Sequence, residues 1–213
     1  MCGRYYLDAQ AEEIAEYFSV ASSPAFDARY NVAPTDLMPI VVQKDRERRI
    51  GPARWGLIPF WAKDEKIGYK TINARIETAP EKPAFREAWK HRRCLVPASG
   101  FYEWRTENGQ KQPYLIRPAR SRIMAFGGLW ERWKNPGDEV VISYTIVTTP
   151  PNETVAELHD RMPLVIAPED FDAWLTGDLA PERSSPGALE VFPVSRDVNS
   201  PRNDRPDLIE RVS

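Results

Sequence analysis

Cys2 follows the first methionine directly, in the opening tetrapeptide Met1-Cys2-Gly3-Arg4. Removal of Met1 would leave Cys2 with a free α-amine and a thiol on adjacent carbons. An α-amine with a reference pKa of about 7.7 to 8.0 is neutral in roughly a quarter of molecules near pH 7.4, so it can attack an aldehyde to form an imine. The thiol can then close a five-membered thiazolidine ring. On these four residues alone, a small apolar residue that opens a strand is the preferred interpretation.

Polar and apolar side chains alternate in TINARIET, residues 71–78. This period of two predicts a strand whose apolar side chains face the core and whose polar ones, Asn73, Arg75 and Glu77, lie side by side on the other face. An amide beside a guanidinium suits an anionic or carbonyl-bearing ligand. An exposed strand face is the commoner explanation of such alternation, and both interpretations stay open.

Glu103 lies between Tyr102 and Trp104 in CLVPASGFYEW, residues 94–104. A carboxylate among aromatic side chains either faces water or occupies a dry pocket. In a dry pocket its pKa rises toward neutrality, as a general acid requires. Spacing alone does not decide between the two.

His159 opens HDRMPLVI, residues 159–166, directly before a stretch that reads as a buried strand. A lone histidine more often has a structural role than a catalytic one. This histidine is nevertheless one of only two in the chain, and it stands close to Arg161. It is therefore a second candidate for proton transfer.

Three aromatic residues, Trp55, Phe60 and Trp61, crowd the loop-like stretch RWGLIPFWAKD at 54–64. Loops normally carry few large apolar side chains. The three either fill an edge of the core or present a flat stacking surface, and from the residues alone we favour the core.

Periodicity and turn signals predict the elements that position these residues. Strands are expected at 3–7, 38–43, 49–57, 113–117, 122–130 and 140–148. Helices are expected at 9–18 with Asp8 as N-cap, at 79–91, from the N-cap Asn152 to near His159, and from Pro168 to about Leu175. We expect one domain over 1–213, with 195–213 as a tail that wraps the surface.

Composition narrows the functional classes. The net charge of -2 argues against a protein that coats nucleic acid through a broad basic face, but a small basic pocket stays compatible with it. Two cysteines form neither a disulfide framework nor a zinc-ligand spacing, which indicates a reducing compartment. No stretch approaches the roughly 18 apolar residues that cross a bilayer, and the N-terminus lacks a signal-peptide pattern. A cytosolic enzyme without metal or cofactor is expected.

At this point the chain resembles the abasic-site processing proteins, also called the SOS response-associated peptidase family. The resemblance covers nearly the whole length and rests on these segments: MCGRY, YNVAPT, RWGLIPFWAKD, the NAR of TINARIET, LVPASGFYEW, TIVTT, HDRMP and VFPVSRDVNSPRND. It implies a single mixed α/β (α+β) domain with a barrel-like β core, peripheral helices and a cleft for single-stranded DNA. It also implies association with the nucleoid during DNA damage.

The resemblance assigns roles residue by residue. Cys2, exposed by loss of Met1, would bond to the ring-opened aldehyde of an abasic deoxyribose as a thiazolidine. Asn73 would orient the N-terminus and the substrate, Glu103 would act as general acid/base, and His159 would assist imine chemistry and ring opening. The residues expected to contact DNA are Arg4, Arg75 and Arg161 at phosphates, with stacking on Trp61 or Phe60. The family's peptidase label refers to release of residues before Cys2; here only Met1 precedes it, and an aminopeptidase could suffice.

Two other functions stay open. In a cysteine peptidase, Cys2 would be the thiol nucleophile, His159 the base and Asn73 the orienting residue. In a binding module for single-stranded or damaged nucleic acid, Cys2 would be incidental. We expect a monomer whose partner is single-stranded DNA with abasic sites, and no membrane association.

Overall fold

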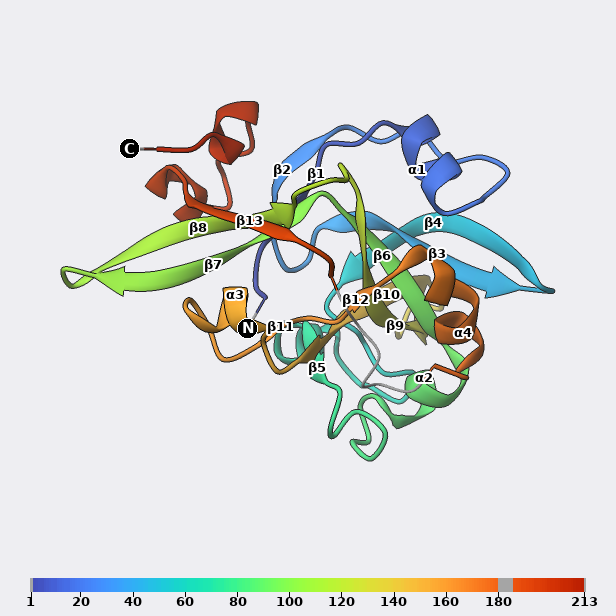
Figure 1. The fold of residues 1–213 in the computed structure, drawn as a ribbon. Coiled ribbons are helices and arrows are strands. Elements are labelled where there is room, and N and C mark those ends of the chain that lie inside the picture. The colour runs from blue at the N-terminus through green and yellow to red at the C-terminus, as the bar shows by residue number, and fades with distance from the viewer. Residues whose placement is uncertain (1, 180–185, 213) are drawn as a thin grey trace.

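The long strands of the chain close into a barrel (Figure 1). A computed structural model describes residues 2–179 and 186–212. The barrel strands are β3 (Leu37–Lys44), β4 (Glu47–Trp55), β6 (Arg93–Ala98), β9 (Met124–Lys134) and β10 (Val140–Thr149). Hydrogen bonds follow the order β10-β4-β3-β6-β9, and β9 pairs again with β10. Only the β10–β4 pair in this ring is parallel.

A second sheet, of five strands, lies against the barrel and carries the N-terminal strand. Its order is β13 (Leu189–Pro193), β8 (Gln110–Pro118), β7 (Gly100–Glu107), β1 (Tyr5–Leu7) and β2 (Arg29–Val32). Side chains alternate between its faces, as the period of two requires. Tyr5 and Phe101 pack edge-on against Phe126 of the barrel. Tyr6 and Tyr102 belong to a separate cluster on the other face.

The barrel interior is joined to the second sheet by a polar contact. The hydroxyl groups of Tyr5 and Tyr144 are 2.7 Å apart, and both residues are fully buried. Trp55 stacks on the Tyr144 ring with centroids 6.4 Å apart, and its indole N–H donates to the carbonyl of Ile72. Strand β1 is therefore fixed to the barrel three residues after Cys2.

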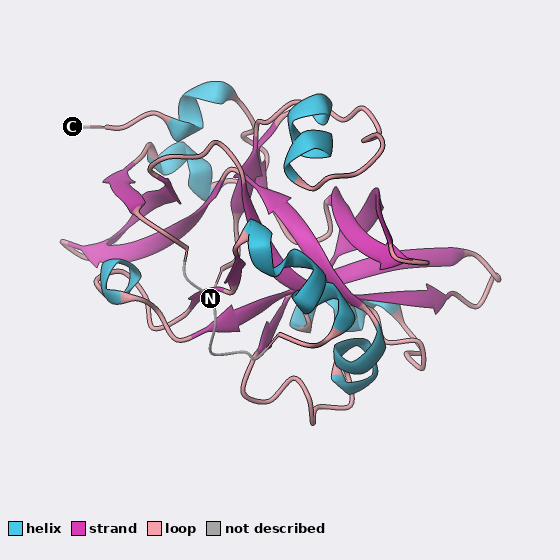
Figure 2. Ribbon diagram, turned by 45° about the vertical axis from the view of Figure 1, so that its right-hand side comes forward, coloured by secondary structure: helices cyan, strands magenta, loops and turns pink. Residues whose placement is uncertain are grey.

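Short helices lie at the periphery of the strands (Figure 2). The α-helices are α1 (Ala11–Tyr17), α2 (Arg86–His91), α3 (Glu153–Ala156) and α4 (Phe171–Thr176), and the 3-10 helices are η1 (Glu65–Lys70), η2 (Pro168–Asp170), η3 (Arg196–Asn199) and η4 (Pro206–Ile209). The remaining short strands are β5 (Asn73–Arg75), β11 (Met162–Pro163) and β12 (Val165–Ile166). No helix in the described ranges is both long and apolar enough to cross a membrane.

Three helix predictions need correction. Helix α1 has Gln10 as its N-cap, and the Gln10 N–H donates to Glu13, whereas the Asp8 N–H donates to the Ser99 hydroxyl. The helix expected at 79–91 is limited to its last six residues. Pro83 explains the late start, because the residue before a proline avoids the helical region. The N-cap at Asn152 is confirmed, since its side chain accepts from the Val155 N–H at 3.0 Å. The helix it opens ends at Ala156, however, and not near His159.

The C-terminal segment packs across the outer face of the five-stranded sheet. Val194, Val198 and Leu208 are buried there in the cluster with Tyr6 and Tyr102. The segment is also bonded to the N-terminal half of the chain, because the buried Asn31 amide donates to three of its carbonyl groups, those of Val198, Ser200 and Asn203.

Candidate active site

Cys2 lies just before the N-terminal end of β1, where the chain runs beside the middle of the antiparallel strand β7. These strands pair antiparallel with Tyr5 opposite Phe101, and the Tyr102 N–H donates to the Arg4 carbonyl at 3.0 Å. Extending this register brings the residues before Arg4 alongside Glu103. Cys2 is fully buried, and burial followed by the charge of Glu103 raises the pKa of its thiol.

Asn73 holds the backbone of Cys2. Its side-chain amide donates to the Cys2 carbonyl at 2.8 Å. Asn73 begins β5, which runs parallel to β10 with Asn73 opposite Ile146. Ala74 is buried and Arg75 is exposed, so the alternation predicted for this strand is confirmed.

Glu103 is a carboxyl group kept nearly dry. It lies on β7 opposite Tyr114 and is only 2% exposed. Burial raises its pKa to about 7, and the carboxylate of Asp160 adds to the shift. The turn that contains His159 therefore lies within electrostatic range of Glu103, and the dry-pocket interpretation of Glu103 is the correct one.

His159 follows α3 and precedes β11. Burial lowers the pKa of its imidazole, so the neutral form is favoured near pH 7. His159 Nδ1 lies 3.0 Å from the Arg161 N–H and 2.8 Å from Asp160 Oδ1. The first contact suits a lone pair on Nδ1 and the second a proton, so the geometry does not assign one tautomer. A neutral imidazole carries one ring proton and one lone pair, so it can take part in proton transfer in either direction.

Arg161 connects the histidine turn to β5. Its guanidinium donates to both carboxylate oxygens of Glu77, at 2.6 and 3.0 Å, and to the Thr148 carbonyl at 2.6 Å. The contact is possible because β5 and β11 both pair with the same end of β10. Sequence reasoning missed this ion pair, and the opposite charges of Glu77 and Arg161 were its only signal.

The three arginines expected at phosphates differ in exposure. Arg75 is exposed, whereas Arg161 is only 7% exposed. Arg4 is half-buried, and its Nη1 donates to Asn31 Oδ1 at 2.8 Å and to the Val198 carbonyl at 3.0 Å. A phosphate near Arg4 or Arg161 would therefore share an arginine that already has protein partners.

The aromatic stretch that begins at the end of β4 divides into a buried and an exposed part. Trp55 is fully buried, so the core interpretation is confirmed for it. It is wrong for Phe60 and Trp61, which are 55% and 49% exposed. They lie in the loop between β4 and η1, where the Trp61 indole N–H donates to the Pro83 carbonyl at 3.4 Å. They are available as a stacking surface.

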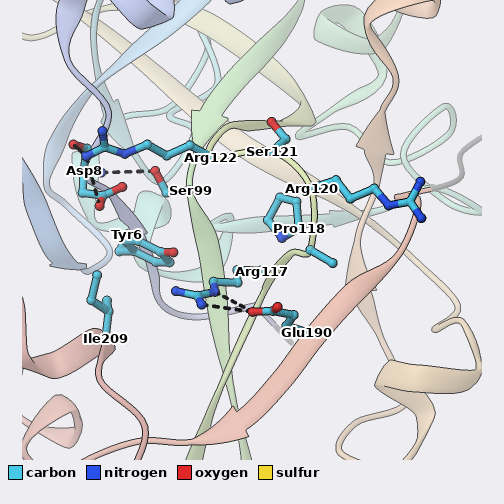
Figure 3. Close-up of a pocket in the computed structure, with 11 residues that line it drawn as sticks. Tyr6, Asp8, Ser99, Arg117, Pro118, Arg120, Ser121, Arg122, Glu190 and Ile209 are labelled. Carbon is cyan, nitrogen blue, oxygen red and sulfur yellow. Dashed lines mark hydrogen bonds and ion pairs between the residues drawn. The ribbon is translucent and has the colours of Figure 1, made fainter.

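A hollow of about 430 Å³ on the five-stranded sheet is distinct from this site (Figure 3). Two of its arginines have carboxylate partners: Arg117 pairs with Glu190 at 3.0 Å and Arg122 with Asp8 at 3.4 Å. The predicted site residues are not part of its wall. In the described part of the chain, histidine, cysteine and acidic side chains form no group that could hold a metal ion.

The fold and this cluster can be compared with known proteins. The family model described as SOS response associated peptidase (SRAP) matches residues 1–201. The chain belongs to the SRAP family. One SRAP relative, the abasic site processing protein YoqW of Bacillus subtilis, is 41% identical over 226 aligned positions that cover 99% of each chain.

Two further comparisons cover the whole chain. The abasic site processing protein YedK of Escherichia coli is 31% identical, with 100% of each chain covered. A crystal structure of a Bacteroides thetaiotaomicron protein superposes with a TM-score of 0.87 at 27% identity, also over 100% of each chain. The mixed α+β fold with a barrel core is thereby confirmed.

Proposed function

We propose that this SRAP protein processes abasic sites in single-stranded DNA by forming a covalent thiazolidine link through Cys2. The observation that carries the proposal is the position of Cys2, held by Asn73 at 2.8 Å and within electrostatic range of a buried carboxyl group whose pKa is about 7. The relatives YoqW and YedK are both named abasic site processing proteins. Three points stay predictions: the DNA strand is single, the protein is monomeric, and it acts at the nucleoid.

The reaction needs two bond-forming steps after Met1 is removed. The Cys2 amine adds to the C1′ aldehyde of the ring-opened sugar, and the carbinolamine loses one water to give an imine. The Cys2 thiol then adds to the imine carbon, and its proton passes to the nitrogen. The product is a thiazolidine, formed with net loss of one water.

The neighbouring side chains supply the proton transfers. Water leaves the carbinolamine when its hydroxyl is protonated, and a carboxyl group with a pKa near 7 is available both as acid and as base. A neutral His159 is a second group that can donate or accept a proton. Asn73 fixes the Cys2 carbonyl, which holds the amine and thiol in one orientation.

The DNA-facing surface we propose combines charge with stacking. Arg75 is the exposed cation beside Asn73, and Arg4 and Arg161 border the same region. Phe60 and Trp61 offer exposed rings for bases that flank the lesion.

A cysteine peptidase is less well supported by the same geometry. A thiol protease requires a thiolate, and burial raises the pKa of the Cys2 thiol. The thiazolidine route starts at the amine and uses the thiol second.

The test is a denaturing gel of the protein with a single-stranded oligonucleotide that contains one abasic site. Wild type should give a covalent band without reduction. Cys2→Ala and Cys2→Ser should give a band only after borohydride, because their imine cannot close to a sulfur ring. A band from Cys2→Ala that is stable without reduction would refute the thiazolidine, and absence of any band from wild type would leave a binding module.

A further inference from the structure

Three segments that are far apart in the sequence meet beside β1: MCGRY, YNVAPT and VFPVSRDVNSPRND. Each contributes one residue to the contact, namely Arg4, Asn31 and Val198. Strand β2 pairs antiparallel with β1 and has Val32 opposite Tyr5, which places Asn31 diagonally across from Arg4. The chemistry proposed above uses neither of the last two segments, so their contact with the first needs its own explanation.

The side-chain amide of Asn31 bonds to both other segments. Its Oδ1 accepts from Arg4 Nη1 at 2.8 Å. Its Nδ2 lies 3.2, 3.0 and 2.7 Å from the carbonyl oxygens of Val198, Ser200 and Asn203. The Val198 carbonyl also accepts from Arg4 Nη1 at 3.0 Å. Because Asn31 is fully buried, an apolar replacement would leave these groups without their partner.

These contacts hold the Arg4 guanidinium without neutralising it. Both acceptors of Nη1 are uncharged oxygens, one of an amide and one of a carbonyl group. The carboxylate of Asp36 acts on Arg4 through its charge, but it is bonded to Arg29 at 2.8 Å. Nε of Arg4 is buried, and in the described part of the chain Nη2 has no hydrogen-bond partner. Nη2 is therefore the side of the guanidinium left for an anion.

We infer that Asn31 is a positioning residue for DNA binding: with the C-terminal segment it fixes the Arg4 guanidinium in the orientation that binds a phosphate of the abasic strand. The inference rests on the proposed function. A free arginine side chain loses rotamer freedom when it binds a phosphate, whereas an anchored one has lost that freedom already. Arg4 lies two residues from Cys2, so its orientation also sets where the strand lies relative to the reactive amine and thiol.

The experiment is a double-mutant cycle of Asn31→Leu and Arg4→Ala. It measures equilibrium binding of a single-stranded oligonucleotide with a non-reactive abasic analogue across salt concentrations. Arg4→Ala should weaken binding and make the slope of log affinity against log salt shallower by about 0.7, the value for one phosphate on a single strand. Asn31→Leu should weaken binding about 2- to 12-fold, the range for one hydrogen bond, and move the slope in the same direction. In the Arg4→Ala background it should change neither quantity.

Asn203→Ala tests the same role at a residue that is not fully buried. Asn203 Nδ2 donates to the Asp197 carbonyl at 2.7 Å, and loss of this bond loosens the loop whose carbonyl groups hold Asn31. Its effect on affinity should be smaller than that of Asn31→Leu and should also vanish in the Arg4→Ala background. This variant decides the question if Asn31→Leu does not fold.

Asn135→Leu is the matched control. The Asn135 side chain also bonds to three groups, the N–H groups of Gly137 and Glu139 and the Glu139 carboxylate, each at 2.8 or 2.9 Å. It lies in the turn between β9 and β10, at the opposite end of β10 from its pairing with β5. Its replacement should lower the urea midpoint and leave affinity and salt slope unchanged.

Two results would overturn the inference. An Asn31→Leu protein that is less stable but keeps the affinity and salt slope of wild type would assign Asn31 a structural role only. Equal losses of affinity from Asn31→Leu with Arg4 present and with Arg4→Ala would show that Asn31 does not act through Arg4.

Covalent chemistry is read out separately, with a reactive abasic oligonucleotide on a denaturing gel. If wild type forms no crosslink while the cycle shows coupling between Asn31 and Arg4, the proposed chemistry fails and the positioning role stands. If wild type forms the crosslink and the cycle shows no coupling, the positioning role fails and the proposed chemistry stands.

Discussion

At the scale of single residues, the burial of Glu103 costs hydration free energy and also makes its carboxyl group suitable for proton transfer. A carboxyl group that is 2% exposed loses most of its hydration, and burial raises its pKa to about 7. At neutral pH the group is therefore divided between its acid and its base form. An ordinary surface glutamate would be almost entirely ionised and would be a poor proton donor.

Glu103→Gln should slow crosslinking by about 10²-fold and leave the affinity for abasic single-stranded DNA nearly unchanged. The amide keeps the shape of the side chain but cannot transfer a proton. Single-turnover rates and equilibrium binding measure the two quantities. Glu107→Gln is the control, because Glu107 lies on the same strand but is bonded to Arg105 at the surface. Equal losses of rate and affinity would assign Glu103 a structural role.

The same carboxyl group should make stability depend on pH. Its folded pKa of about 7 is above its ordinary value of 4.5, so the folded state binds the proton more tightly than the unfolded state. The stabilisation that this tighter proton binding gives the folded state is fully present below about pH 4.5 and is lost as pH rises through about 7. Glu103→Gln should therefore exceed wild type in unfolding free energy by up to about 3 kcal/mol at pH 8, with little difference at pH 4.

Urea titrations at both pH values measure this difference. A glutamine variant that is less stable than wild type at pH 8 would show that the carboxylate gains more from its native contacts than it loses through burial.

At the scale of elements, the contact between β1 and β10 fixes the strand that carries Cys2. Tyr5→Phe or Tyr144→Phe alone leaves one buried hydroxyl without its partner, and each should cost about 1 to 2 kcal/mol of unfolding free energy. The double variant removes both hydroxyl groups and should recover most of the loss. Urea unfolding of all four proteins measures the coupling. Strictly additive losses would show that the two hydroxyl groups act independently.

Local sequence patterns predict most of these elements. The strands near 38–43, 113–117 and 140–148 were expected from their periodicity, and Asn73 was placed correctly on the polar face of its strand. Barrel closure was expected only from the family resemblance, because pairing between distant strands leaves no local signal.

Features that depend on such long-range pairing are the ones the sequence could not show. The bond between Glu77 and Arg161 exists because β5 and β11 meet at one end of β10. The exposure of Phe60 and Trp61 depends on how their loop leaves the barrel, and hydrophobicity alone favoured the core.

At the scale of the whole molecule, a net charge of -2 requires that DNA binding depend on a few local contacts. About three phosphate contacts, at Arg4, Arg75 and Arg161, predict a slope of log affinity against log salt near -2 for single strands, at roughly 0.7 per phosphate. Titration of an abasic single strand across salt concentrations measures it. A much steeper slope would indicate a broad basic surface.

Duplex DNA should react more slowly than single strands. The C1′ aldehyde must reach a fixed N-terminus, and swinging the sugar out of a stacked duplex costs a few kcal/mol that a single strand does not require. Crosslinking rates at saturating DNA compare the two substrates. Equal rates would mean that the site accepts a stacked sugar.

The central claim is a covalent bond between the processed N-terminus and the lesion, and intact mass spectrometry of the unreduced complex tests it most directly. We predict one species whose mass equals the chain without Met1 plus the abasic oligonucleotide minus one water, with the link mapped to Cys2 after digestion. An adduct on a chain that retains Met1, a link at another residue, or no covalent species at all would contradict the account.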